Sequence, residues 1–258
     1  MSWVEAVLLG VLQGVTEFVP VSSSAHLKMA RLLLGMKTQE TVLFDLFCHL
    51  GTLLAVLFFL KSEITDLFRS ERKKLALLFI ALLPLIPSYF LLKPLRTFLS
   101  KPEHLGVCLM ATSAILFLGG KYRLRRENSS SMKRQVSDAL WIGAMQSAAL
   151  IPGISRSAST VSCARVLGWE ASKAVRFSFL LSIPTIIGGN CLELLKIVCS
   201  EHTAPTSIPL SFCLAGFLCS CITGFLLIRR AIAFLEKGNP KPFAWYCLIV
   251  GACAACIF

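Results

Sequence analysis

The sequence predicts an all-α polytopic membrane protein, with six transmembrane helices and two re-entrant helical hairpins arranged as an inverted repeat. Three observations carry this prediction. The 258-residue chain has a mean hydropathy of +0.73 and only 16% charged residues, which excludes an ordinary soluble domain. Its basic residues gather in short connectors between apolar runs. Two apolar stretches are interrupted near their middle by polar runs that contain proline, serine and charged residues.

The apolar runs set the expected helices. A helix needs about 20 apolar residues to cross a hydrocarbon core of ~30 Å. Six runs approach that length: 43–60, 75–92, 105–120, 175–198, 208–228 and 243–258. Two further stretches, about 3–35 and 138–168, are each divided into halves too short to span. We therefore expect each to enter the membrane, turn, and leave by the same face.

The basic connectors test this topology. Connectors 61–74, 121–134 and 229–241 carry five, six and four Lys or Arg, whereas 93–104 carries three and 199–207 carries none. Placing the three richest connectors in the cytoplasm forces the other two outside. The alternation works only if the interrupted stretches do not cross, so both termini are expected outside.

An internal repeat supports the same arrangement. A shift of 133 residues aligns 11 identical positions between 6 and 52, among them Gln13 with Gln146, Ser22 with Ser155 and Ser24 with Ser157. We expect one domain over 1–258, with repeat 1 at about 1–60 and repeat 2 at about 134–198. The runs 75–92, 105–120, 208–228 and 243–258 complete the bundle. Inverted repeats with broken helices place a binding site where the two breaks meet.

The net charge of +12 and the 11 cysteines have simpler explanations than a ligand site. The connectors that carry the charge indicate membrane topology and anionic headgroups, and no nucleic-acid partner is expected. The cysteines show no metal-ligand spacing, and most lie inside apolar runs, where a thiol behaves as a small hydrophobe.

The first polar run, 17–26, combines a carboxylate, a hydroxyl cluster and an imidazole. Pro20 is expected to end the entering helix, and the serines that follow are expected to cap the returning helix, whose N-terminus attracts anions. Glu17 and His26 flank this turn. Charged groups at membrane depth are costly and are retained mainly where they function.

The second polar run, 152–160, places a guanidinium in a similar turn. Pro152 and Gly153 break the helix, and Ser155, Ser157 and Thr160 favour a returning N-terminus around Arg156. A guanidinium suits planar, bidentate recognition of phosphate. Two helix N-termini, hydroxyls and one arginine therefore predict a phosphate pocket.

Structural roles remain open for the same residues. Glu17 and Arg156 can form an ion pair with no further role, and the membrane serines can bond back to their own backbone. Gln13 and Gln146 can bridge helices. His49, near the start of a span, can simply pack.

The strings QGVTEFVPVSSSAHL at 13–27 and PGISRSAST at 152–160 resemble the two signatures of the undecaprenyl-pyrophosphate phosphatase family, also called the bacitracin-resistance family. The context FDLFCHLGTLLAV at 44–56 is similar too, and the likeness covers essentially the whole chain. His49 stands where the family more often has Gln, and Ala25 where it frequently has Gly. At position 13 the first motif of the family usually has Glu or Gln, and this chain has Gln13.

The resemblance implies a multi-pass enzyme of the bacterial plasma membrane that removes the terminal phosphate of undecaprenyl (C55) diphosphate. This reaction recycles the lipid carrier for cell-wall synthesis. The resemblance also implies dependence on a divalent cation, Mg²⁺ or Ca²⁺, competition with bacitracin for the lipid substrate, a homodimer, and an active site facing the outer side.

We expect three sets of site residues. The expected catalytic residues are Glu17, Ser23, His26 and Arg156. The expected substrate-binding residues are Gln13, Ser22, Ser24, Ser155, Ser157 and Thr160. The expected metal ligand is Glu17.

The order of chemical events stays open at this stage. Ser23 can attack phosphorus with Glu17 or His26 as base, or His26 can attack directly or protonate the leaving phosphate. We favour Ser23 as nucleophile and His26 as proton carrier.

One rival function is a transporter or flippase that moves a phospholipid or anion without cleaving it. The inverted repeat favours that reading, whereas the acid, hydroxyl and imidazole together favour hydrolysis. A purely structural scaffold leaves the two intramembrane charges unexplained.

Overall fold

The computed structural model describes residues 1–36, 42–124, 131–199 and 208–258, and these segments are helical with no strand among them. The first half of the chain forms α1 (Trp3–Thr16), α2 (Ser23–Leu33), α3 (Val42–Phe59), α4 (Lys61–Arg69), α5 (Arg72–Leu82), α6 (Leu85–Leu91) and α7 (Lys93–Leu99). The second half forms a short 3₁₀ turn, η2 (Pro102–His104), then α8 (Leu105–Lys121), α9 (Met132–Ala148), α10 (Arg156–Val166), α11 (Ala171–Cys199), α12 (Leu210–Glu236) and α13 (Lys241–Ile257).

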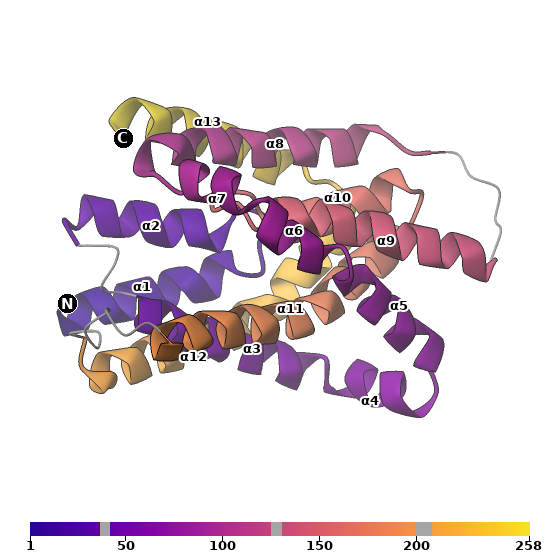
Figure 1. Ribbon diagram of the computed structural model, residues 1–258, viewed down its shortest axis with the longest axis horizontal. Coiled ribbons are helices and arrows are strands. Elements are labelled where there is room, and N and C mark those ends of the chain that lie inside the picture. Colours follow the sequence, from indigo (N-terminus) through magenta and orange to yellow (C-terminus); the bar gives the residue numbers. More distant parts are fainter. Residues whose placement is uncertain (37–41, 125–130, 200–207) are drawn as a thin grey trace.

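The long helices lie roughly along the long axis of the molecule, and the N- and C-termini lie at the same end (Figure 1). Five helical segments are long and apolar enough to cross a membrane: Val42–Phe59, Arg72–Leu91, Pro102–Lys121, Ala171–Cys199 and Leu210–Glu236. The apolar helix α13 is slightly shorter. The protein is therefore a helical membrane protein with several long apolar helices.

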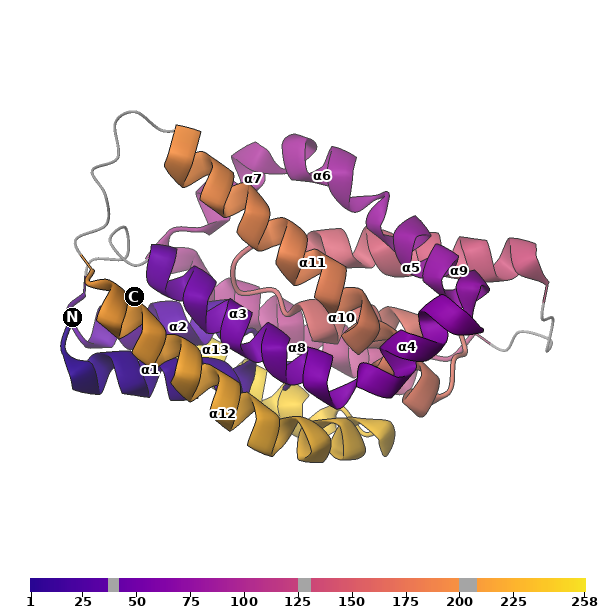
Figure 2. The same cartoon turned by 90° about the horizontal axis from the view of Figure 1, so that it is seen from below.

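Two helical hairpins reach only the middle of the molecule. The pair α1 and α2 runs inward from the end that holds the termini and returns to it, whereas α9 and α10 do the same from the opposite end (Figures 1 and 2). Their turns, 17–22 and 149–155, lie next to each other, since Arg156, directly after the second turn, donates to Glu17 in the first. The two polar runs thus meet in the interior.

Small residues let the helices around the first hairpin pack closely. A Cβ on Gly10 of α1 would lie only 2.7 Å from the carbonyl oxygen of Gly216 on α12. A residue larger than glycine at position 10 would therefore push the two helices apart. On the same helix α12, Ser220 donates to the carbonyl of Cys48 on α3 at 2.9 Å. These contacts fix α1, and with it the first turn, against the long helices.

The expected single span at 75–92 is divided in the structure. The helix α5 ends at Leu82 and α6 begins at Leu85, with Pro84 at the junction. Proline lacks the N–H that would continue the hydrogen-bond ladder. In contrast, Pro184 lies inside the continuous helix α11. The hydropathy pattern alone does not distinguish these two outcomes.

Candidate active site

The first turn places a carboxylate at the end of a helix. Glu17 is the C-cap residue of α1, and its N–H donates to the carbonyl of Gln13 at 3.0 Å. A negative charge at a helix C-terminus is unfavourable because the helix dipole is negative there. The carboxylate therefore needs donors from elsewhere, and the structure provides three.

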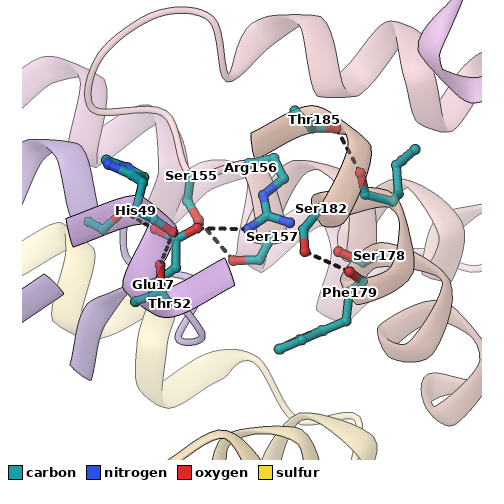
Figure 3. Close-up of polar contacts among 12 residues, drawn as sticks. Glu17, His49, Thr52, Ser155, Arg156, Ser157, Ser178, Phe179, Ser182 and Thr185 are labelled. Atoms are coloured by element: carbon teal, nitrogen blue, oxygen red, sulfur yellow. Dashed lines mark hydrogen bonds and ion pairs between the residues drawn. The ribbon is translucent and has the colours of Figure 1, made fainter. Parts of the chain in front are cut away.

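Both oxygens of Glu17 accept hydrogen bonds. Oε1 accepts from Nη2 of Arg156 at 3.0 Å, which forms an ion pair between the two hairpins (Figure 3). Oε2 accepts from Ser23 Oγ at 2.7 Å and from Gln13 Nε2 at 3.1 Å. The Glu17 and Arg156 side chains are only 7% and 17% exposed, so little water screens them. This cluster joins three of the four expected catalytic residues.

The second turn is fixed by the neighbouring helix α8. Gly153 has a φ of +102°, and a Cβ there would lie 2.4 Å from the Cβ of Cys108. Thr112 donates to the carbonyl of Gly153 at 2.9 Å and accepts from the N–H of Ser155 at 3.1 Å. Glycine is therefore required at this position, and the bonds to Thr112 set where Arg156 begins α10.

The two returning helices begin differently. Ser155 caps α10, because its hydroxyl accepts from the N–H of Ala158 at 3.3 Å, as expected. Ser22 precedes α2 with a φ of +69°, and its side chain makes no capping bond, contrary to our expectation for the first serine cluster. Because no side chain among the described residues caps α2, its first-turn N–H groups can bind an anion.

A pocket of about 260 Å³ opens between the two turns. It is smaller than the ~300–1,000 Å³ of pockets for drug-sized ligands, which suits a compact polar headgroup. The residues on its lining are Thr16, Glu17, Val19, Ser22, Ser23, Ser24, His49, Leu85, Gln146, Ala149, Leu150, Ile154, Ser155, Arg156, Ser157, Thr185, Ile186, Gly189 and Asn190.

Most of the expected binding hydroxyls lie on this pocket. Ser22, Ser24, Ser155 and Ser157 line it, and their hydroxyls pair as Ser22 with Ser24 and Ser155 with Ser157. Thr160 lies elsewhere. It donates to the carbonyl of Arg156 at 2.9 Å and bonds the Ser178 hydroxyl at 2.6 Å, so it positions α10 against α11.

Gln13 is buried behind Glu17 and is not on the lining. Its Nε2 orients the carboxylate, whereas its Oε1 has no hydrogen-bond partner within the described segments. An unpaired buried amide oxygen beside a carboxylate is a feature that a bound cation or a donor would satisfy.

The structure places His26 outside the pocket. Its Nδ1 lies 2.8 Å from the carbonyl oxygen of Ser22, and its Nε2 lies 2.8 Å from the hydroxyl of Tyr246 on α13, on which the ring also stacks. Both ring nitrogens are thus engaged away from Glu17. His26 lies one helical turn from Ser23 on α2, yet its ring contacts Tyr246 on α13 and not Glu17.

The histidine that lines the pocket is His49 on α3 (Figure 3). Its Nδ1 lies 2.7 Å from the carbonyl oxygen of Asp45, one turn earlier. A carbonyl only accepts, so Nδ1 carries the hydrogen and Nε2 is the nitrogen left for a ligand. Sequence reasoning assigned His49 no more than a packing role.

Two amides that were not expected as ligand groups also line the pocket. Gln146 on α9 and Asn190 on α11 each present a side-chain NH₂ that is buried and has no partner within the described residues. Thr185 contacts Oε1 of Gln146 at 3.3 Å. The alignment of Gln13 with Gln146 and of Thr52 with Thr185 was the sequence signal that marked two of these three residues.

The acidic groups do not form a complete metal site. Within the segments that the structure describes, no group of three or more His, Cys, Asp or Glu could hold a metal ion. The pocket lining contains one carboxylate, Glu17, with the unpaired Oε1 of Gln13 close behind it. Mg²⁺ is often bound by one or two carboxylates together with phosphate oxygens of the substrate. These residues therefore fit a cation that binds with its substrate.

Comparison with known proteins identifies the family. Residues 6–253 match the model described as "Bacitracin resistance protein BacA". The chain belongs to this family. It is 39% identical over 255 residues to an undecaprenyl-diphosphatase of Protochlamydia amoebophila, with 98% of each chain covered.

Two further relatives have the same name and align over nearly their whole length. The chain is 34% identical to an undecaprenyl-diphosphatase of Parabacteroides distasonis, with 97% of this chain and 96% of that one covered. It is 36% identical to one of Desulfatibacillum aliphaticivorans, with 98% and 97% covered. The similarity therefore extends over both hairpins and all the long helices.

Proposed function

We propose that this protein hydrolyses undecaprenyl diphosphate to undecaprenyl phosphate and inorganic phosphate. The observation that carries the proposal is the cluster in which Glu17 accepts from both Ser23 and Arg156 at one wall of the pocket. A carboxylate, a hydroxyl and a guanidinium are the groups that phosphoryl transfer to a serine requires. The relatives' name specifies the C55 diphosphate as the substrate.

Arg156 and the open N-terminus of α2 bind the terminal phosphoryl group. The guanidinium at the start of α10 contacts Glu17 through Nη2 and leaves other N–H groups for phosphate oxygens. Because the transition state carries its charge on those oxygens, fixed donors in a water-poor pocket stabilise it more than the ground state. Gln146 and Asn190 contribute neutral donors to the remaining phosphate.

Ser23 is the nucleophile in this proposal. As its hydroxyl proton passes to Glu17, Oγ forms a bond to the terminal phosphorus, and the bond from that phosphorus to the bridging oxygen breaks. The electron pair leaves with the lipid monophosphate. Water then attacks the phosphoserine, which releases inorganic phosphate and restores Ser23. The 2.7 Å distance between Ser23 Oγ and Glu17 Oε2 supports Glu17 as the base.

His49 replaces His26 as the proposed proton carrier. The leaving phosphate lies on the pocket side, where the Nε2 of His49 is available, whereas His26 contacts Ser22 and Tyr246. In this assignment His26 positions the first turn by joining it to α13.

A divalent cation, Mg²⁺ or Ca²⁺, would be bound by Glu17, the Gln13 amide oxygen and phosphate oxygens of the substrate. It would neutralise charge on the phosphoryl oxygens. Glu17 is the metal ligand in this proposal, as the sequence predicted.

The membrane arrangement follows from the basic connectors and the course of the helices. We propose six spans, with α5 and α6 counted as one and α13 as the last, and α1–α2 and α9–α10 as re-entrant hairpins. The termini then lie outside the bacterial plasma membrane, and the pocket faces outward. Bacitracin competition for the substrate and a homodimer belong to the same proposal.

Phosphate release from a C15 or C55 prenyl diphosphate by the purified protein in detergent tests the function, with and without Mg²⁺ or Ca²⁺. Wild type is compared with Glu17→Ala, Ser23→Ala and Arg156→Ala, and Thr97→Ala on exposed α7 serves as the control. Metal-dependent release that only the control retains is the expected result. A folded wild type that binds the lipid without releasing phosphate would favour the flippase instead.

A further inference from the structure

A second polar cleft lies far from the two hairpin turns, at the end of the molecule opposite the termini. Its volume is about 1,090 Å³. The turn between α4 and α5 forms one wall, and the N-terminal parts of α9 and α11 with the α10–α11 loop form the others. These segments lie at the end of the ribbon opposite the termini (Figures 1 and 2). No residue on this cleft lines the catalytic pocket, so the two are separate sites.

The cleft is strongly basic. Seven of its lining residues are Lys or Arg, against three that are Asp or Glu. The basic residues are Arg69, Arg72, Lys73, Lys74, Arg134, Lys173 and Arg176.

The acidic residues of the cleft already have partners. Glu71 pairs with Lys74 at 3.0 Å, Glu170 with Lys173 at 3.1 Å, and Asp138 accepts from the indole of Trp169 at 2.9 Å. Within the described segments, none of these acids pairs with Arg69, Arg72 or Lys73, which project from one short turn. Three cations on one rim therefore remain for an anionic ligand.

An apolar groove of about 180 Å³ begins beside this rim. Its lining, from α3, α4, α5 and α11, contains no charged residue. Phe68 of the groove directly precedes Arg69 of the cleft, and Leu180 lies one helical turn beyond Phe177. Phe68 and Phe79 are 62% and 59% exposed, so the groove opens toward the surrounding lipid.

We propose that the cleft and groove together bind an anionic glycerophospholipid of the bilayer. Its headgroup phosphate lies against Arg69, Arg72 and Lys73, and an acyl chain lies in the groove. Basic pockets between membrane helices are suited to such headgroups. The adjoining apolar groove favours a lipid over a soluble phosphate, because a soluble anion has no acyl chain to bury in it.

Charge-matched variants test this site. In the cleft variant, Arg69, Arg72 and Lys73 are each replaced by Gln. In the control variant, Lys93, Arg96 and Lys101, three cations near the other end of the molecule, are replaced in the same way. Binding of dioleoyl phosphatidylglycerol and dioleoyl phosphatidylcholine to detergent-purified protein is measured by native mass spectrometry and by the shift in thermal unfolding temperature.

Wild type and the control variant are expected to bind phosphatidylglycerol more tightly than phosphatidylcholine. The cleft variant should lose about tenfold or more of its affinity for phosphatidylglycerol alone, since each cation near a membrane surface contributes on the order of fivefold. Equal loss in both triple variants, or unchanged selectivity in the cleft variant, would overturn the site.

A second comparison separates the lipid from a soluble anion. Glycerol 1-phosphate and inorganic phosphate should give no thermal shift at concentrations where the dioleoyl lipid saturates. Phe79→Ser, at the exposed edge of the groove, should weaken binding of the dioleoyl lipid but not binding of a dihexanoyl lipid. If the soluble phosphates raise the unfolding temperature of wild type as much as the lipid does, the ligand is not a lipid.

Discussion

The two hairpins share a backbone plan but differ in the chemistry of their turns. The shift of 133 residues aligns Ser22 with Ser155 and Ser24 with Ser157. At the position between these pairs, however, Ser23 aligns with Arg156. The shift also sets Glu17 against Leu150. One turn therefore supplies the acid and the hydroxyl, and the other supplies the cation. The comparison teaches that approximate symmetry can build a pocket while its function depends on where the symmetry fails.

The turns also differ in local stability. Ser155 has an ordinary extended backbone with φ of −75° and caps its helix. Ser22 has φ of +69° and caps nothing. In the second turn the positive φ falls on Gly153, where it costs little, whereas in the first it falls on a serine. The strained turn is the one that carries the proposed nucleophile.

Breaking the pair between the hairpins should have the largest effect. Arg156→Lys keeps the charge but loses the planar fork, and we expect turnover to fall on the order of 100-fold or more, as when one transition-state donor is removed. Glu17→Gln should do at least as much, because it removes the base. Phosphate release with matched unfolding curves measures both, and near-normal turnover in Arg156→Lys would contradict the pocket model.

The next comparison sets Ser23 against Ser157, a hydroxyl of the other turn. Ser23→Ala should lower turnover roughly 10³-fold because the covalent step is lost, whereas Ser157→Ala should lower it less than about tenfold. Rapid quenching with ³²P-labelled diphosphate should trap label on wild type and on Ser157→Ala. Label retained by Ser23→Ala would exclude Ser23 as the nucleophile.

The two histidines give a smaller effect that separates catalysis from positioning. His49→Gln should lower turnover about tenfold to 100-fold without lowering the unfolding temperature, because a proton donor is lost. His26→Gln should lower the unfolding temperature and change turnover less, since its bonds to Ser22 and Tyr246 are structural. Phosphate release and thermal unfolding measure the two effects, and the opposite pattern would restore His26 as the proton carrier.

Substitutions at Ser22 and Ser155, the residues that precede the two returning helices, should have opposite and the smallest effects. Ser22→Gly should raise the free energy of unfolding by about 1 kcal/mol by relieving the positive φ. Ser155→Ala should lower it by about 1 kcal/mol through loss of the cap. Thermal unfolding in detergent measures both. Equal destabilisation by the two changes would mean that Ser22 has a stabilising role that its geometry does not reveal.

The sequence predicted the long helices and one part of the central cluster because these depend on local rules. Apolar run length predicted the helices, and proline with glycine predicted the break before Ser155. Gln13 and Glu17 are one helical turn apart, so their contact follows from helix geometry. The ion pair between Glu17 and Arg156 was one of the structural alternatives that the sequence left open, since charged groups inside a membrane are usually paired.

The choice of histidine depended on tertiary packing. His26 is three residues from Ser23, but its ring faces α13, and sequence does not specify which helix packs there. His49 and Asn190 reach the pocket from α3 and α11, which lie far from either motif along the chain. Pro84 interrupts its helix, whereas Pro184 lies inside an intact one. Which of these outcomes a proline gives also depends on the helices packed around it.

One wall of the catalytic pocket is apolar, with Leu85 of α6 and Ile186 and Gly189 of α11, and an added Cβ at Gly189 would touch nothing. The serines and Arg156 form the opposite, polar side. In the proposed reaction, the two products therefore depart into different phases, the polyprenyl phosphate sideways into lipid and the inorganic phosphate into water. The lipid product can therefore leave before water attacks the phosphoserine, without crossing the path by which inorganic phosphate departs.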